Sequence, residues 1–151
     1  MVPVKDAVAA GGPEGASGAV ATDGKVSSEL VVEAADVKRR FFSDEVLRGA
    51  TLSLHRGELV ALIGRSGSGK STLLHILGGL DREWTGSVKV FGQELSTKSD
   101  RELCRLRNQE IGFVFQAFHL LDHLSCVENV ALPNAFSDGP LEKAQAAARA
   151  I

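Results

Sequence analysis

The sequence predicts an α/β fold in which an antiparallel β edge lies beside a parallel core sheet with flanking helices. Two observations lead to this class. Residues 58–63 read ELVALI, a short continuous apolar run of the kind that is buried on both faces of a parallel sheet. The period then changes, and the leucine and isoleucine side chains of residues 73–80 recur at the spacing of a helix that packs one face on a sheet. A strand that feeds a packed helix is the building unit of α/β proteins.

The composition limits the possible functions. The chain has 151 residues, of which 44 % are hydrophobic, enough for one domain with a real core. Its formal net charge of −2 gives no field that would attract nucleic acid, so we predict no nucleic-acid partner. No apolar run approaches the roughly 18 residues that a membrane-spanning helix needs. We therefore expect a soluble protein that is not exported.

The N-terminal part divides into a leader and a β edge. Residues 1–28 are rich in Gly, Ala, Ser and Pro without a strand or helix period, and we expect a disordered leader there. The ordered part, residues 29–151, opens with two β-rich stretches, LVVEAADV from Leu30 and VLRGATLSL from Val46. These two stretches are predicted to pair as the antiparallel edge, and a turn at residues 55–57 leads to the ELVALI strand.

Further elements follow the first helix, which we expect from about Gly69 to Leu80. A strand is predicted at GSVKVFG, and IGFVF, residues 111–115, should be a strand of the same core sheet. Serine and glutamate three residues apart twice form a possible capping box, at Ser99 and Glu102 and at Ser125 and Glu128. LEKAQAAARAI, residues 141–151, starts another alanine-rich helix.

The loop between the ELVALI strand and the first helix carries the clearest chemical signal. Its spacing is Gly-x-x-x-x-Gly-Lys-Ser, in which glycines let backbone N–H groups turn inward and approach an anion closely. The N-terminus of the following helix adds a partial positive charge. Lys70 supplies a full charge for the β- and γ-phosphates, Ser71 a hard oxygen ligand for Mg²⁺, and Thr72 a contact to the α-phosphate. The predicted nucleotide-binding residues of this loop are Gly64, Arg65, Ser66, Gly67, Ser68, Gly69, Lys70, Ser71 and Thr72.

A phosphate loop alone does not name a reaction, because kinases, GTPases and motor ATPases share it. A second stretch, IGFVFQAFHLLDHLSCVENVALP, is informative. There an apolar run ends at Gln116, whose amide oxygen can reach Mg²⁺ or the attacking water. Lys70 and Gln116 are therefore the predicted catalytic residues, and Ser71 and Gln116 the predicted metal ligands.

Taken together, these stretches resemble the nucleotide-binding subunit of ABC transporters. The resemblance rests on VLRGATLSLHRGELVALIGRSGSGKSTLLHILGGLD, TGSVKVFGQEL and LRNQEIGFVFQAFHLLDHLSCVENVALP, which cover most of residues 30–133. STLLHILGGLD and the HLL…VENV continuation look most like the branch that serves lipoprotein release, macrolide export and a division-associated transporter. The resemblance implies a P-loop NTPase fold of ABC type, Mg²⁺ and ATP as cofactors, and an ATPase that energises membrane transport.

The same resemblance implies roles for individual residues and partners. Gln116 is the Q-loop glutamine, and the segment after it would dock on a transmembrane permease subunit. Phe41 is the closest match to the aromatic residue that stacks on adenine, and Phe42 is the next. A second nucleotide-binding subunit would complete a dimer, and the protein would lie in the cytoplasm on the inner face of the inner membrane. Asp122 departs from the proline that the family commonly has after HLL.

Several family motifs do not occur in the sequence. No LSGGQ-like signature, no apolar strand ending in Asp-Glu and no switch histidine follow Gln116. We therefore expect residues 29–151 to be the N-terminal portion of a nucleotide-binding domain, incomplete at its C-terminus, and this chain alone to be inactive as an ATPase. Two alternatives stay open at this point, a non-catalytic nucleotide-binding fragment and a soluble P-loop kinase.

Overall fold

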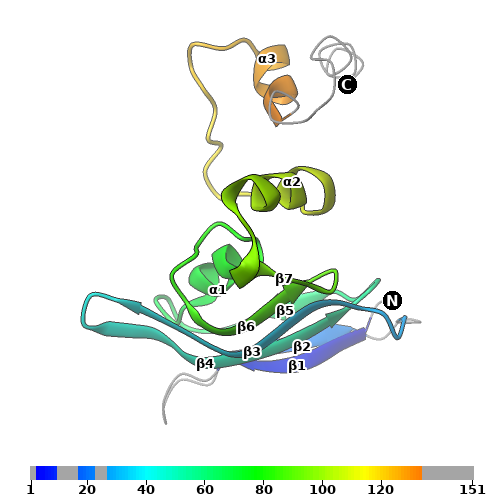
Figure 1. Ribbon diagram of the computed structural model, residues 1–151, viewed down its shortest axis with the longest axis vertical. Helices are drawn as coiled ribbons and strands as arrows, with labels where there is room; N and C mark the ends of the chain where they lie inside the picture. Colours follow the sequence, from blue (N-terminus) through cyan, green and yellow to red (C-terminus); the bar gives the residue numbers. More distant parts are fainter. Residues whose placement is uncertain (1–2, 10–16, 23–26, 134–151) are drawn as a thin grey trace. The chain divides into compact units, whose positions relative to one another are not determined.

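The computed structural model describes residues 3–9, 17–22 and 27–133, which belong to two compact units. The first unit is Met1–Lys98 and the second is Ser99–Ile151. Figure 1 shows the first unit as strands with helix α1 (Lys70–Leu77) beside them, and the second as helices α2 and α3 with an irregular segment between them. Among the described residues, no helix combines the length and the apolar character needed to cross a membrane.

The larger sheet of the first unit has four antiparallel strands in the order β4-β3-β6-β7. β3 spans Leu30–Phe41 and β4 spans Asp44–His55, which confirms the predicted antiparallel pair. β6 (Thr85–Val90) confirms the strand expected at GSVKVFG, and β7 is Gln93–Glu94, followed by the 3-10 helix Leu95–Thr97. The sheet alternates buried and exposed side chains, as an antiparallel sheet with one covered face does.

Helix α1 packs on this sheet and closes the core. It contacts β3, β4 and β6, and its buried side chains are Leu73 and Ile76. The helix ends where two glycines follow it, since Gly78 is the C-cap and Gly79 has a φ of +66° that side-chain-bearing residues rarely adopt. The 3-10 helix contributes Leu95 to the core, and the sheet contributes the remaining buried apolar residues of the unit, Ala34, Val37, Leu47, Ala50, Leu52, Val88 and Val90.

A smaller sheet corrects two sequence-based expectations. β1 (Pro3–Ala9), β2 (Ser17–Thr22) and β5 (Val60–Leu62) form it in the order β1-β2-β5. The segment expected to be a disordered leader therefore contains two strands. A composition of small residues does not indicate a strand, because such segments become ordered through hydrogen bonds to a neighbouring strand. The rest of the leader lies outside the described residues, apart from its last two residues.

The pairing of β5 is the second correction. The ELVALI strand was expected to be a central parallel strand, but Val60, Ala61 and Leu62 pair antiparallel with Ala21, Val20 and Ala19. Every strand pair among the described residues is antiparallel. The backbone groups of β5 require partners, and in this structure β2 provides them.

The second unit contains α2 (Asp100–Glu110) and α3 (Cys126–Ala131). Both predicted capping boxes are present, at Ser99 with Glu102 and at Ser125 with Glu128. Residues 111–115 do not form the predicted strand. An extended segment becomes a β-strand only when it hydrogen-bonds to a neighbouring strand, and no described strand pairs with these residues. The helix predicted at residues 141–151 lies outside the described residues.

Candidate nucleotide-binding site

The predicted phosphate loop connects the end of β5 to the start of α1. β5 ends at Leu62 and α1 begins at Lys70, so residues 63–69 turn the chain from strand to helix. A backbone hydrogen bond from Ser68 N to Arg65 O, 3.2 Å long, closes a turn inside the loop. The strand, glycine loop and helix predicted from the sequence therefore occur in that order.

Two glycines of the loop have backbone angles that favour glycine. Gly67 has a φ of +78° and Gly69 a φ of +87°. Gly69 also packs closely, because a Cβ at this position would lie 2.7 Å from Leu47 Cδ2 and 3.0 Å from Val46 O. Gly69 therefore brings the start of α1 against β4 as well as turning the chain.

The side chain of Lys70 lies across the loop. Its ammonium group donates hydrogen bonds to Gly64 O at 2.9 Å, Arg65 O at 2.7 Å and Ser68 Oγ at 3.3 Å. These three bonds use all three donors of the ammonium group. The positive charge is thus held among the loop residues that the spacing predicted to contact phosphate.

The N-terminus of α1 differs from those of the other two helices. Among the described residues, no side chain caps α1, whose N-cap is Gly69, and its first turn has no acidic residue. Helices α2 and α3 instead each have a serine cap and a glutamate that accepts from it. The first N–H groups of α1 and its positive dipole end are therefore not neutralised by an acidic side chain, which suits an anionic ligand.

Ser71, one of the two predicted metal ligands, lies at the start of α1 next to Thr72, the predicted contact to the α-phosphate. Ser71 is exposed and Thr72 is half-buried. No group of three or more His, Cys, Asp or Glu side chains that could hold a metal ion occurs in the described part of the chain. A hydroxyl group with phosphate oxygens and water is a donor set that suits Mg²⁺, which usually binds with few protein ligands.

The aromatic candidates for adenine stacking lie at the hairpin between β3 and β4. Phe41 is 41 % exposed, and the Arg39 guanidinium carbon lies 4.0 Å from its ring centroid. Phe42 lies in the turn with a φ of +52° and is fully exposed. The Phe41 ring therefore contacts the guanidinium group of Arg39, whereas the Phe42 side chain is exposed to solvent.

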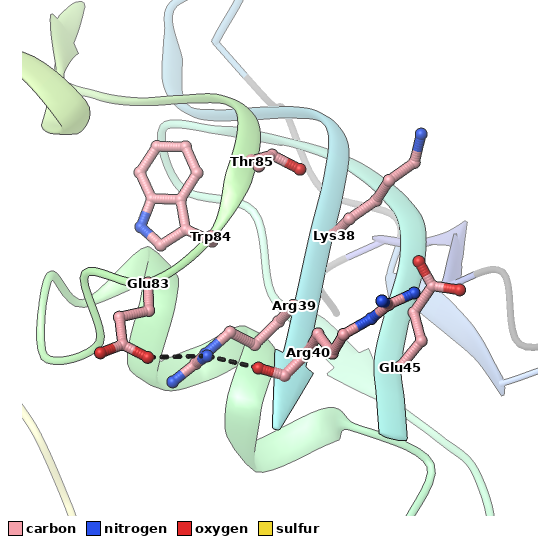
Figure 2. A pocket seen from close by; sticks show the side chains of 7 residues that line it. All are labelled: Lys38, Arg39, Arg40, Glu45, Glu83, Trp84 and Thr85. Atoms are coloured by element: carbon pink, nitrogen blue, oxygen red, sulfur yellow. Dashed lines mark hydrogen bonds and ion pairs between the residues drawn. The ribbon is translucent and has the colours of Figure 1, made fainter. Parts of the chain in front are cut away.

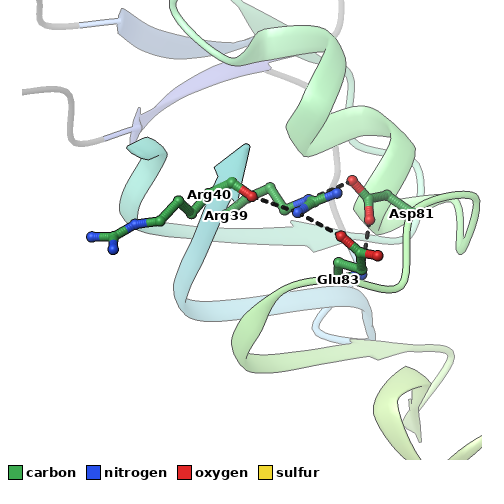
Figure 3. A network of polar contacts seen from close by, with 4 residues as sticks. All are labelled: Arg39, Arg40, Asp81 and Glu83. Carbon is green, nitrogen blue, oxygen red and sulfur yellow. Dashed lines mark hydrogen bonds and ion pairs between the residues drawn. The ribbon is translucent and has the colours of Figure 1, made fainter. Parts of the chain in front are cut away.

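Arg39 is a residue that the sequence reasoning missed. It is the one buried charged residue of the described chain, with 9 % exposure, and it forms ion pairs with Asp81 and Glu83 (Figure 3). The hydrogen bond with Asp81 raises the pKa of the arginine, so its charge is permanent. The KRRFF stretch gave no sign of which arginine would be buried, because that depends on the register of β3.

An open pocket of about 380 Å³ lies beside Arg39 (Figure 2). It carries three cationic side chains, two carboxylates and an indole ring. None of the residues that the sequence predicted for the site lines it. The lining residues are Lys38, Arg39, Arg40, Glu45, Glu83, Trp84 and Thr85.

Gln116 belongs to the second unit, in the irregular segment between α2 and α3. It is exposed and lies between members of a short aromatic cluster, in which the ring centroids of Phe113 and Phe115 stack at 5.3 Å and His119 meets Phe115 edge-on at 5.0 Å. The glycine loop belongs to the first unit, so Gln116 and the loop are described separately. The catalytic and metal-binding roles of Gln116 remain predictions.

The turn before α3 is organised by a second residue that the sequence reasoning missed. The Asn129 amide oxygen accepts from Leu121 N at 2.9 Å, and its nitrogen donates to Leu121 O, Leu124 O and Ser125 O at 3.1–3.2 Å. The VENV stretch signalled a helix, but a side chain that bonds back to four loop groups is visible only in the structure. Asn129 fixes residues 121–125, the centre of the segment predicted to meet a permease.

Strand, glycine loop, uncapped helix and lysine follow one another in the order that the sequence predicted for a nucleotide-binding α/β protein, and comparisons with known proteins refine this class. The family described as ABC transporter matches residues 47–151. The chain is 44 % identical over 115 residues to the lipoprotein-releasing system ATP-binding protein LolD of Cytophaga hutchinsonii, covering 76 % of this chain and 52 % of that protein. The chain therefore belongs to the ABC transporter family.

Other relatives agree with this assignment. LolD of Alcanivorax borkumensis is 53 % identical over 89 residues, which are 59 % of this chain and 39 % of that protein. The macrolide export ATP-binding/permease protein MacB of Escherichia coli O157:H7 is 42 % identical over 124 residues, which are 80 % of this chain and 19 % of that protein. These two names confirm the predicted branch of lipoprotein release and macrolide export.

A solved structure confirms the fold. The dimeric, post-hydrolysis ATP-binding cassette MJ0796 bound to ADP and Pi superposes with a TM-score of 0.66 at 32 % identity, covering 79 % of this chain and 54 % of that one. The chain thus has the fold of an ABC cassette, and it spans about half the length of the LolD protein and of this structure.

Proposed function

We propose that this chain binds Mg-ATP through the loop at residues 64–72 and is part of an ATP-binding subunit that energises a membrane ABC transporter by ATP binding and hydrolysis. The observation that carries the proposal is the uncapped, acid-free N-terminus of α1 beneath a lysine held across the glycine loop. The relatives carry names of lipoprotein release and macrolide export, so we assign the transporter to this branch. The soluble kinase and the non-catalytic fragment are not favoured.

In this proposal the triphosphate lies against the first turn of α1. The N–H groups of the loop and helix donate to phosphate oxygens, and Lys70 exchanges its carbonyl partners for the β- and γ-phosphates. The Ser71 hydroxyl would hold Mg²⁺, whose positive charge would neutralise the negative charge that develops during phosphoryl transfer. Gln116 orients the attacking water, and Phe41 stacks on the adenine.

The partners and the location are part of the same proposal. The segment after Gln116 docks on a transmembrane permease subunit, and a second nucleotide-binding subunit faces the first. Large apolar side chains that are exposed in this segment support such a contact, including Phe118 at 90 % and Leu120 at 64 % exposure. The subunit then lies on the cytoplasmic face of the inner membrane.

The test is Mg-ATP binding to the 151-residue chain, measured by calorimetry, in Lys70→Ala and in the matched control Lys89→Ala. Lys89 is an exposed lysine on β6 of the same unit. Since a charge-assisted hydrogen bond contributes about 1.5–3 kcal/mol, Lys70→Ala should weaken binding about tenfold or more, while Lys89→Ala leaves it unchanged. Equal affinity in all three proteins would contradict the assignment.

A further inference from the structure

We propose that Arg39 is a positioning residue that holds the ring of Phe41 for stacking on the purine base of the nucleotide, an inference that rests on the proposed function. Its guanidinium lies over one face of the Phe41 ring, with Cζ 4.0 Å from the centroid. The ring keeps 41 % of its surface exposed, which leaves room for a second planar group. A phenylalanine at the end of a hairpin would otherwise sample several rotamers, and ordering it costs free energy on binding.

Arg39 can hold the ring because its own position is fixed by three oxygen acceptors. Its Nε donates to Asp81 Oδ2 at 2.8 Å, and its Nη1 donates to Arg40 O at 2.6 Å and lies 3.1 Å from Glu83 Oε2 (Figure 3). The planar fork of an arginine permits these bonds while its face rests on an aromatic ring. With 9 % exposure, the side chain has little freedom to leave this arrangement.

Asp81 in turn ties this arrangement to the helix of the phosphate loop. Asp81 N and Leu80 N both donate to His75 O, at 3.2 and 2.8 Å, so the chain remains bonded to α1 beyond the two glycines. Asp81 Oδ1 also accepts from Glu83 N at 2.8 Å. The aromatic ring is thereby connected to the C-terminal end of the helix whose N-terminal end carries Lys70.

A purely structural role of Arg39 predicts a different result from a positioning role. Loss of a structural residue would disturb α1 and weaken all ligands of the loop. Loss of a positioning residue should weaken only ligands that have a base. Mg-ATP and Mg-tripolyphosphate, which lacks the base and the ribose, therefore separate the two roles.

The experiment measures the affinity of both ligands for the 151-residue chain and its Arg39→Gln variant by calorimetry. We expect Arg39→Gln to weaken Mg-ATP about three- to tenfold, the range typical of a cation–π contact, and to leave Mg-tripolyphosphate unchanged. The matched control is Arg40→Gln, since Arg40 is exposed and loses the same charge one residue away. This control should not change the ratio of the two affinities.

A double-mutant cycle tests whether Arg39 acts through Phe41. In a Phe41→Leu background, Arg39→Gln should have no further effect on Mg-ATP. If Arg39→Gln does not fold, Arg39→Lys replaces it, because a lysine keeps the ion pair with Asp81 but covers less of the ring, and the same selective loss of ATP is expected.

Three results would overturn the inference. They are equal losses of both ligands, no loss of either, and an undiminished effect of Arg39→Gln when Phe41 is leucine. Mg-ATP binding by the unmodified chain distinguishes a failure of this inference from a failure of the proposed function. If the unmodified chain does not bind Mg-ATP at all, both the proposed function and the role of Arg39 are wrong. If it binds Mg-ATP through Lys70 and Arg39→Gln changes neither affinity, only the role of Arg39 is wrong.

Discussion

Gly69 and Leu47 lie so close that a Cβ on the glycine would be 2.7 Å from Leu47 Cδ2, at the point where α1 meets β4. Gly69→Ala should therefore destabilise the fold through this overlap and through its φ of +87°. Gly67→Ala is the matched control, because Gly67 has a φ of +78° but, apart from its two chain neighbours, no described residue has a heavy atom within 4 Å of its Cβ position. We expect Gly67→Ala to cost about 1–2 kcal/mol and Gly69→Ala about 1–3 kcal/mol more, by urea unfolding. Similar losses in the two variants would contradict this packing.

Glu94 should make the first unit sensitive to acid. Burial alone would raise its pKa, but hydrogen bonds from Ser87 Oγ, Val88 N and Ser96 Oγ outweigh burial and hold it below the ordinary value of 4.5. A lowered folded-state pKa gives stability above pH 4.5 that is lost as the pH falls through the folded pKa.

Glu94→Gln is the variant that tests this pH dependence. It should lower stability at pH 7 by about 1 kcal/mol, because a half-buried carboxylate is partly screened by solvent. It should also flatten the acid limb of the stability curve, measured by urea unfolding between neutral and acidic pH. Asp44→Asn, at an exposed position of β4, is the control and should leave that limb intact. An identical acid limb in Glu94→Gln would refute the role of Glu94.

The capping box of α3 predicts a measurable pKa change. The hydrogen bonds of Glu128 with the Ser125 hydroxyl and backbone N–H lower the pKa of the glutamate, with a smaller effect of His123. Ser125→Ala should therefore raise the pKa of Glu128 toward 4.5, as measured by an NMR titration of its side chain. His123→Gln should move it less. A larger effect of the histidine would show that charge, not the cap, sets this pKa.

Asn129→Ala should loosen the turn at residues 121–125 without unfolding α3. The amide of Asn129 bonds to four backbone groups of this turn, while the α3 cap uses Ser125 and Glu128 independently. Amide hydrogen exchange of Leu121, whose N–H donates to Asn129 Oδ1, should accelerate about tenfold or more. Asn108→Ala in α2 provides the control. Unchanged exchange at Leu121 would mean that Asn129 does not hold the turn.

The features that the sequence predicted correctly all depend on neighbours in the chain. The β3–β4 pair and both capping boxes are set by residues a few positions apart, whereas the predicted end of the first helix at Leu80 was wrong, since α1 ends at Leu77. The order of strand, glycine loop and helix belongs to the same class, since the glycines, the lysine and the helix start are contiguous. Patterns of this kind can be predicted because the contiguous residues themselves determine the local backbone conformation.

The features that the sequence did not predict depend on residues far apart. β5 pairs with β2 across about forty residues, a choice that an apolar run cannot specify. Residues 111–115 have the composition of a strand but no described ladder partner. Arg39 is buried because Asp81 lies opposite, 42 positions along the chain. Asn129 reads as an ordinary helical residue until its contacts with the preceding turn are seen.

The three hydrogen bonds of Lys70 have a consequence for the thermodynamics of ligand capture. The ammonium group ties Gly64, Arg65 and Ser68 together, which restricts the conformations open to the glycines between them. Much of the conformational entropy that a flexible loop loses on binding has thus been lost during folding. In the proposed function, capture of a triphosphate would exchange the acceptors around one cation in a preorganised loop, and its entropic penalty should be correspondingly small.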